Sequence, residues 1–329
     1  MKKTRRLLAA LLSLVLLAGC KQSPEIYRKT YLDLFDTVTT ISGSGMGQEV
    51  FVSQADALHD ALLEYHRLLD VYNSYEGMNN LKTVNDQAGI APVTVDGRII
   101  DFLLFARQMY CATGGRVDVT MGSVLKLWHE ARTAALENPE QSYLPHEEAL
   151  QDAGTHTGFR KLVIDRENGT VFITDPLLRL DVGAMAKGWA LEQVCKDAPP
   201  GILLDLGGNI GITGPKANGD PWVIGIQDPN SHGYLQTLEQ SQGAVVTSGD
   251  YQRYYTVEGQ RYHHIIDPET LYPAGYWQSV TIFCEDSGVA DALSTALFLM
   301  DRQEGQALLD QYNARAWWVD REGNLMASP

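Results

Sequence analysis

Cysteine is scarce in this sequence, and its spacing does not suit cysteine chemistry. The 329 residues contain four cysteines, and no two of them form a C-x-x-C pair. This pattern excludes a disulfide-dense scaffold and a thiolate zinc site. Cys20 lies close to the N-terminus, and we expect the other three (Cys111, Cys195 and Cys284) to be small core residues.

Basic residues are also few. The chain has 26 Lys and Arg against 41 Asp and Glu, which gives a formal net charge of −15. A protein with this excess of negative charge repels nucleic acid and anionic lipid surfaces. We therefore expect no nucleic-acid partner. The 44% hydrophobic content is ordinary for a globular protein of one large or two small domains.

No hydrophobic run is long enough for a membrane-spanning helix. The apolar segment LLAALLSLVLLAG follows the basic stretch MKKTRR and ends at Cys20. Its length and its L-A-G-C ending resemble a bacterial lipoprotein signal. We therefore expect removal of residues 1–19, lipidation of Cys20, a tether over 20–30 and a catalytic domain over 31–329. That protein would be anchored by its lipid at the extracytoplasmic face of the cell envelope.

Hydrophobic periodicity predicts an α+β fold with mixed or antiparallel sheets and flanking helices, and an arrangement in two lobes is compatible with it. We expect one strand over 31–42 and a surface excursion over 129–145. Asp96 is the expected cap of a helix over 97–113, and Pro145 opens a short helix. The other expected helices are 54–75, 184–198, 288–300 and 303–312. The other expected strands lie within 161–174, 201–214, 222–228, 243–249, 252–267, 277–286 and 315–327.

One predicted helix, VADALSTAL, carries a possible metal site. Asp291 and Thr295 are four residues apart, so a carboxylate and a hydroxyl share one helix face. Two hard oxygens suit Mg²⁺ or Ca²⁺ better than zinc. Such a pair is more often a solvated face or a local hydrogen bond. The apolar neighbours favour a function here, because a lone buried carboxylate is costly.

Glycine-rich segments give weaker signals. LRLDVGAMAKGWA places Asp181 and Lys187 around a strand-to-helix turn, where N–H groups attract phosphate, although the Walker A ending is absent. LLDLGGN does not match the dinucleotide fingerprint. Ser248 lacks a G-x-S-x-G elbow, so a serine hydrolase is a weakly supported alternative. Tyr75 lies on a polar loop and could stack on a planar ring or cover the core.

Two adjacent histidines precede the turn in HHIIDPETLYP. Side chains alternate along a strand, so His263 and His264 must face opposite ways. Histidine is the side chain best suited to accept a proton near neutral pH.

Taken together, the order of these motifs resembles the ApbE family, the FAD:protein FMN transferases. The blocks are FDT, SxY, GGxxDxTxG, LDxGxxAKG, LxDxGGN, TSGDYxRY, HIIDPxT and ADALSTA, running from about Phe35 to about Met300. The resemblance implies binding of FAD and Mg²⁺, and transfer of FMN to a Thr or Ser hydroxyl of an exported acceptor protein, with release of AMP.

The resemblance also implies residue roles. His264 would take the acceptor proton, while His263 faces away. Mg²⁺ would be held by the Asp291 carboxylate, the Thr295 hydroxyl and the Ala184 carbonyl. Flavin contacts would come from Phe35, Tyr75, Arg116, Val117, Asp118, Asp181, Lys187, Ile265 and Ile266.

The sequence departs from the family pattern in places. DVTMGS stands where many relatives have prolines, Leu271 stands where Gly is frequent, and Asn79-Asn80 replaces a common Ser-Glu. Two alternatives stay open on the same fold. One is an FAD pyrophosphatase, in which water replaces the acceptor hydroxyl. The other is a non-catalytic flavin-binding lipoprotein, against which the Asp291, Thr295 and His264 set argues.

Overall fold

The structure is a computed structural model that describes residues 24–329. The expected signal peptide, Cys20 and the first part of the expected tether therefore lie outside the described residues. Between residues 24 and 329, no helix has both the length and the apolar character needed to cross a membrane.

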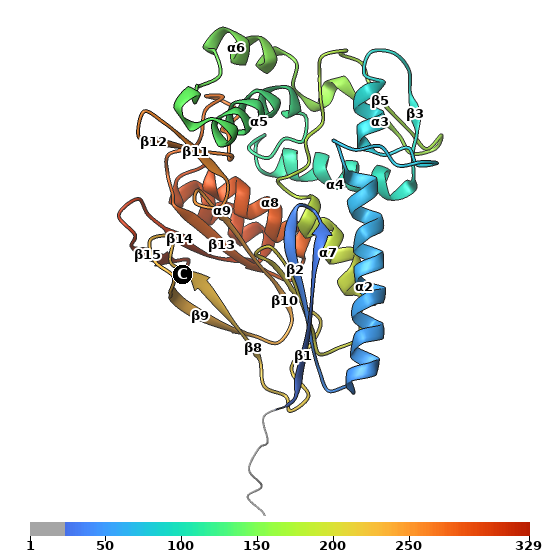
Figure 1. Cartoon of the computed structure of the whole chain (residues 1–329), viewed down its shortest axis with the longest axis vertical. Coiled ribbons are helices and arrows are strands. Elements are labelled where there is room, and N and C mark those ends of the chain that lie inside the picture. The colour runs from blue at the N-terminus through green and yellow to red at the C-terminus, as the bar shows by residue number, and fades with distance from the viewer. Residues whose placement is uncertain (1–23) are drawn as a thin grey trace, which may run out of the picture.

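An eight-stranded sheet forms the centre of the molecule (Figure 1). Its strand order is β1-β2-β6-β7-β10-β13-β14-β15, and every neighbouring pair is antiparallel. The arrangement confirms the predicted α+β fold. The strands are β1 (Ile26–Leu34), β2 (Thr37–Ser44), β6 (Ile202–Leu206), β7 (Asn209–Ile212), β10 (Gly243–Gly249), β13 (Ser279–Cys284), β14 (Arg315–Val319) and β15 (Leu325–Ala327).

The two faces of this sheet have different covers. Val246 and Trp318 belong to a core shared with α8 and α9, whereas Val245 and Trp317 pack with Trp222 under the β8–β9 hairpin. This follows from the pleat, which sends successive side chains to opposite faces. The helices are α2 (Gln48–Leu69), α7 (Ala186–Asp197), α8 (Ser287–Phe298) and α9 (Arg302–Tyr312), and the hairpin is β8 (Trp222–Gln227) with β9 (Tyr234–Gln240).

A second, mainly helical lobe lies beyond one end of the sheet, at the top of Figure 1. Asp96 caps α4 as predicted, because its carboxylate accepts the Arg98 N–H at 2.9 Å. The lobe contains α3 (Leu81–Asp86), α4 (Gly97–Ala112), α5 (Gly122–Glu137), α6 (Glu147–Thr155), the 3₁₀ turns Pro139–Gln141 and Phe159–Lys161, the sheet β3 (Val93–Thr94), β5 (Thr170–Ile173) and β4 (Leu162–Asp165), and the hairpin β11 (Tyr254–Val257) with β12 (Gln260–His263).

The N-terminal segment differs from the prediction. The single strand expected over 31–42 is the hairpin β1–β2, which turns at Phe35 and Asp36 with φ of 49° and 53°. Two left-handed residues in succession fit the twist of a tight hairpin. Since β1 begins at Ile26, residues 26–30 are strand and not tether.

Two other expectations were wrong. Residues 129–137 are not a surface excursion, because they continue α5. Cys111 is exposed on α4 and does not belong to the core, whereas Cys195 is half-buried and Cys284 is buried. Burial raises the pKa of the Cys284 thiol, so it stays protonated near neutral pH.

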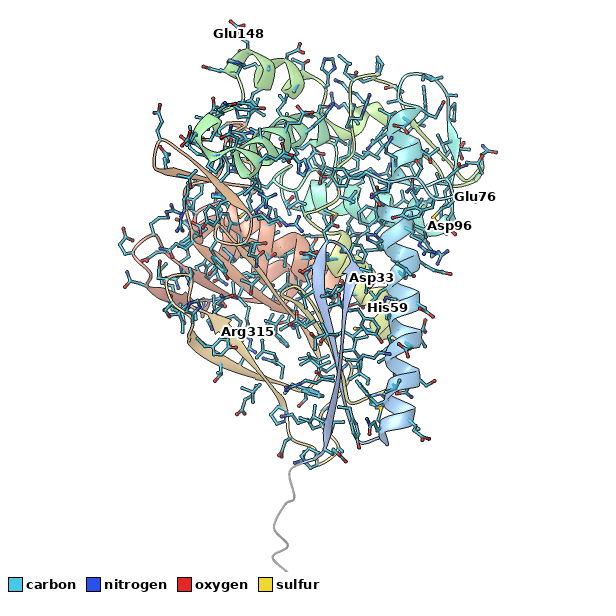
Figure 2. All side chains as sticks on the ribbon, in the orientation of Figure 1. Asp33, His59, Glu76, Asp96, Glu148 and Arg315 are labelled. Carbon is cyan, nitrogen blue, oxygen red and sulfur yellow. The ribbon has the colours of Figure 1, made fainter. Side chains whose placement is uncertain are left out.

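A polar cluster fastens β1 to α2 away from the site described below. Figure 2 shows Asp33 and His59 side by side, and their side chains are 3.0 Å apart. The His59 ring stacks on Tyr31 with centroids 4.3 Å apart. Asp60 contacts the other ring nitrogen at 3.1 Å, so this imidazole has carboxylate partners on both sides.

Candidate active site

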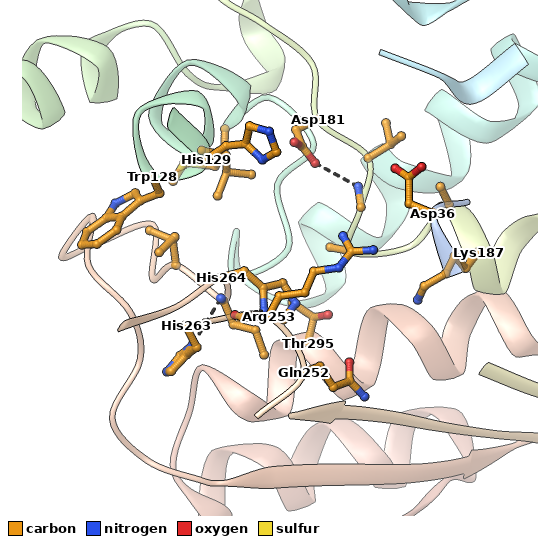
Figure 3. A pocket seen from close by; sticks show the side chains of 18 of the residues that line it. Asp36, Trp128, His129, Asp181, Lys187, Gln252, Arg253, His263, His264 and Thr295 are labelled. Carbon is orange, nitrogen blue, oxygen red and sulfur yellow. Dashed lines mark hydrogen bonds between the residues drawn. The ribbon is translucent and has the colours of Figure 1, made fainter. Parts of the chain in front are cut away.

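A cavity of about 850 Å³ lies between the helical lobe and the helices that cover the sheet. Figure 3 shows that Lys187, Thr295, His264 and Asp181 reach it from separate segments. The walls come from the β1–β2 tip, the end of α2, residues 116–118, α5, the segment leading into α7, the β11–β12 hairpin with its flanks, and Thr295 of α8.

The first wall is formed where α7 and α8 touch. Asp291 is only 3% exposed, and its Oδ2 accepts the Gly188 N–H at 2.8 Å. A Cβ at Gly188 would lie 2.4 Å from both the Asp291 Cβ and the Ser287 carbonyl oxygen, so only glycine allows this approach. The two helices therefore hold the carboxylate in one place.

This contact also satisfies a main-chain group at the start of α7. Gly188 is the third residue of that helix, so its N–H is one of the first four, which have no partner within the helix. That N–H donates to Asp291, and Ala184, just before the helix, lines the cavity and presents a carbonyl that a ligand can use. Thr295 lines the cavity one helical turn beyond Asp291.

This wall therefore offers oxygens of three kinds: the Thr295 hydroxyl and the Ala184 carbonyl on residues that line the cavity, and the Asp291 carboxylate just behind them. Among residues 24–329 there is no cluster of three or more His, Cys, Asp or Glu side chains that could hold a metal. The set is nevertheless compatible with a hard cation, because Mg²⁺ is commonly held by one or two carboxylates together with substrate phosphates and water.

Lys187 adds a positive charge beside this set. Its Nζ donates to the Asn209 side-chain oxygen at 2.6 Å and is 4.0 Å from Asp291 Oδ1. The lysine is therefore anchored from the sheet while its charge faces the cavity.

The opposite wall carries the two histidines, and the structure separates them. His263 is 7% exposed; its Nε2 donates to the Ala274 carbonyl at 2.8 Å and its Nδ1 accepts the Ile265 N–H at 3.2 Å. Both nitrogens are used, so this ring holds the loop in place. His264 follows directly and is exposed to the cavity, and Figure 3 shows the two rings pointing apart.

The tautomer of His264 follows from its contacts. Its Nδ1 lies 3.1 Å from the Arg253 carbonyl, which can only accept, so Nδ1 carries the proton and Nε2 is the free base. Desolvation in the wall, with the charges of Arg253, His263 and Lys187, lowers the pKa of His264 well below its usual range. The imidazole is consequently neutral near pH 7.

The β1–β2 tip closes a third side. The Phe35 N–H donates to Nδ1 of His66 at 3.1 Å, and the two rings meet edge to face with centroids 5.3 Å apart. His66 lies in the last turn of α2, so this bond fixes the left-handed turn over the cavity. Tyr75 stands behind it, donating to Asp70 at 2.7 Å.

Two further carboxylates line the cavity. Asp118 accepts from the Thr120 N–H and hydroxyl at 2.8 and 2.6 Å, and Asp181 accepts the Gly183 N–H at 2.9 Å. Burial raises the pKa of both groups. Each is therefore a hydrogen-bond acceptor that is easier to protonate than an ordinary aspartate.

The cavity gathers most, but not all, of the residues predicted from sequence. Tyr75 does not line it, and Asp291 lies just behind the lining. The predicted residues that line the cavity are Phe35, Arg116, Val117, Asp118, Asp181, Ala184, Lys187, His264, Ile265, Ile266 and Thr295. Ser248 lies elsewhere, and its hydroxyl pairs with that of Ser294 at 2.8 Å and not with a histidine.

Sequence reasoning missed several cavity residues. Trp128, His129 and Arg132 come from α5, of which residues 129–137 were expected to belong to a surface excursion, and His66 comes from the end of α2. Arg253 belongs to the TSGDYQRYY segment but carried no assigned role. The spacing of Trp128 and Arg132, one helical turn apart, was the available signal for a shared face.

The comparisons with known proteins agree with this fold. Residues 35–318 match the model of the ApbE family. The FAD:protein FMN transferase of Treponema pallidum is 34% identical over 284 residues, covering 78% of this chain and 76% of that protein. That of Vibrio cholerae is 29% identical, covering 93% and 91%.

Solved structures give the same result. The ApbE protein of Thermotoga maritima superposes with a TM-score of 0.82 at 31% identity, covering 92% of this chain and 97% of that one. The flavin transferase ApbE of Vibrio cholerae shares the fold, with a TM-score of 0.75 at 22% identity and coverage of 93% and 97%. The chain therefore belongs to the ApbE family.

Proposed function

We propose that this protein transfers FMN from FAD to a Thr or Ser hydroxyl of an acceptor protein, with Mg²⁺ as its metal. One observation carries the proposal: a neutral histidine with a free Nε2 faces the cavity opposite an all-oxygen set flanked by Lys187. Phosphoryl transfer needs this combination, because it depends on positioning and charge neutralisation more than on covalent catalysis.

The chemical step uses the two walls for different tasks. The acceptor hydroxyl oxygen bonds to the FMN phosphorus, and its proton moves to Nε2 of His264. The bond from that phosphorus to the bridging oxygen breaks, and AMP leaves with the electron pair. Because the pKa of His264 is lowered, the imidazole is unprotonated at neutral pH and Nε2 keeps a free lone pair for the acceptor proton.

The metal would be held by the Ala184 carbonyl, Asp291 Oδ1 and the Thr295 hydroxyl. The Gly188 N–H supports this assignment, because it occupies only Oδ2 of Asp291 and leaves Oδ1 available. When bound, Mg²⁺ supplies Lewis-acid neutralisation of the diphosphate charge. Phe35, Arg116, Asp118, Asp181 and the Ile265–Ile266 pair stand around the remaining space as flavin contacts.

Water is the competing nucleophile, since His264 faces an open cavity. The decisive experiment is mass spectrometry of an acceptor domain after incubation with the purified protein, FAD and Mg²⁺. We expect an FMN adduct on a single Thr or Ser, lost with EDTA and in His264→Ala. FMN and AMP without an adduct would indicate an FAD pyrophosphatase. Unconsumed FAD that co-purifies would indicate a flavin-binding protein and overturn the proposal.

We also propose that the protein works at the extracytoplasmic face of the cell envelope, anchored through Cys20, and that its acceptor is exported. The support is the basic, apolar and L-A-G-C succession at the N-terminus. Membrane fractionation of cells expressing the chain tests it. The wild-type chain, lipidated at Cys20, should sediment with membranes. The Cys20→Ala variant cannot carry the lipid and should not sediment with them.

A further inference from the structure

We propose that Arg132 and Arg253 form a phosphate subsite, which holds the phosphate of FAD that is not transferred and keeps it as AMP leaves. The inference rests on the proposed function and adds to it a site for the leaving nucleotide. Both residues line the cavity, one from α5 and one from the segment before β11.

Neither guanidinium has an ion-pair partner among residues 24–329. Other arginines of this chain do: Arg321 lies 2.7 Å from Asp250, and Arg166 lies 2.8 Å from Asp101. Asp181 lines the same cavity and feels the charge of Arg253, but the two side chains do not form an ion pair. Both guanidiniums therefore keep donors for an anion that comes from outside the chain.

Arg132 is the stronger case, because its Nε is enclosed and has no hydrogen-bond partner. A guanidinium cannot shed its proton at physiological pH, so the enclosed N–H needs an acceptor. Burial, together with the charge of Arg253 across the same cavity, lowers the pKa of Arg132. A bound anion would accept a hydrogen bond from the enclosed Nε–H of Arg132 and would offset the repulsion between the two positive charges.

Two guanidiniums in one cavity match a phosphate better than a carboxylate. A phosphate monoester carries close to two negative charges and three acceptor oxygens, whereas a carboxylate carries one charge and two oxygens. Arginine forks pair with phosphate through two parallel N–H···O bonds, and each fork can take its own edge of the group.

The position of Arg253 assigns the subsite to the leaving phosphate. Its carbonyl accepts the His264 N–H and Nδ1–H, both at 3.1 Å, so this residue adjoins the base. In the proposed reaction the phosphorus under attack would lie between His264 and the oxygen set of α7 and α8. The second phosphate would then face the α5 side of the cavity, to which Arg132 belongs. Figure 3 shows the Arg253 side chain extending from His264 toward Asp181.

The arrangement also suits the chemistry of the step. When the bond to the bridging oxygen breaks, AMP acquires the additional negative charge. A guanidinium beside that phosphate stabilises the negative charge that develops in the transition state. Such an interaction lowers the activation barrier, whereas binding that is equally strong in the ground state and the transition state does not.

Calorimetric titration of the purified protein with AMP and with adenosine, without FAD, metal or acceptor, tests the subsite. We expect Arg132→Gln and Arg253→Gln to weaken AMP binding at least tenfold and to leave adenosine binding unchanged. Arg132→Lys, which keeps the charge but loses the fork, should fall between. Lys126→Gln is the matched control, since Lys126 is on the same helix and pairs with Glu130 at 3.7 Å outside the cavity. Near-ultraviolet circular dichroism checks that each variant is folded.

The outcomes separate this inference from the proposed function. AMP binding that is absent, unchanged in both variants, or equally weakened in Lys126→Gln overturns the subsite. A raised KM for the acceptor protein with unchanged AMP affinity assigns the arginines to the acceptor, and also overturns it. If the protein transfers no FMN but AMP binding still depends on both arginines, the subsite stands and the transferase proposal falls.

Discussion

The two walls of the cavity are built in different ways. On the helix wall, formed by α7 and α8, Asp291 is almost fully buried and is held by a main-chain N–H through a contact that only glycine allows. On the hairpin wall, formed by α5 and the β11–β12 hairpin, His264 and Arg253 are exposed to the cavity. The main-chain carbonyl of Arg253 accepts hydrogen bonds from the main chain and the ring of His264. The first wall fixes charge in place. In the proposed function, the second wall carries the groups that take up the proton and hold the leaving nucleotide.

The largest effect is expected on the hairpin wall. His264→Ala removes the proposed base and should lower kcat for FMN transfer by about 10²- to 10⁴-fold, the usual contribution of general-base catalysis. Stability should change little, because the side chain is exposed and makes one hydrogen bond. Single-turnover kinetics with FAD and an acceptor domain measure the rate.

His263→Gln is the matched comparison. Its ring makes two hydrogen bonds and packs edge to face on Phe298, with centroids 5.5 Å apart. This variant should lose about 1–3 kcal/mol of stability, because buried polar groups lose their partners. Its kcat should fall far less than that of His264→Ala. A larger fall in His263→Gln would reverse the roles given to the two histidines.

On the helix wall, activity and stability can be separated at Asp291. Asp291→Asn keeps an acceptor for the Gly188 N–H but removes the negative charge, so Mg²⁺-dependent activity should fall by about 10²-fold or more while the melting temperature stays close to that of the parent. Asp291→Ala should lose activity and also about 1–3 kcal/mol of stability from the unpaired N–H. Equal melting temperatures for the two variants would contradict the structural part of this account.

Gly188 should be costly to change for steric reasons alone. A methyl group there meets the Asp291 Cβ and the Ser287 carbonyl oxygen at 2.4 Å, so Gly188→Ala should lose about 1–3 kcal/mol and require more Mg²⁺ for half-maximal activity. Gly97→Ala is the control, because a Cβ at that helix position meets nothing within 4 Å. Urea denaturation and a Mg²⁺ titration of activity measure the two effects. Similar losses in both variants would point to backbone entropy or propensity and not to crowding.

The same contrast explains what could be predicted from the sequence. The pair at Asp291 and Thr295 was visible because both residues lie on one helix at a fixed spacing. Arg132 could not be assigned, because its partner in the cavity is more than a hundred residues away and depends on how α5 packs against β11. A helix that turns polar residues toward a cavity lacks the usual division into an apolar and a polar face. For this reason residues 129–137 were expected to be a surface excursion.

Local turn chemistry was a second limit. The segment from Tyr31 to Ser42 alternates like one strand, yet it folds back at Phe35 and Asp36, which lack the glycine or asparagine that usually marks such a turn. The turn is held from outside by His66, which accepts the Phe35 N–H. By contrast, the turn between β6 and β7 carries the usual residues, because Gly207 and Gly208 both take a positive φ, which glycine adopts without strain.

The smallest expected effect concerns the charge that Arg253 places near His264. The neutral imidazole is the active form, so the rate should fall only as pH drops through the pKa of His264, which is held well below its usual 6.5 by desolvation first and by the charges of Arg253, His263 and Lys187 after it. Arg253→Gln removes one of these charges. The pKa then rises, and the acidic limb of the kcat profile should move to higher pH by roughly half a pH unit, as expected for one partly screened charge. Lys126→Gln should leave the limb where it is, and a limb that moves to lower pH in Arg253→Gln would show that His264 is not the group that titrates.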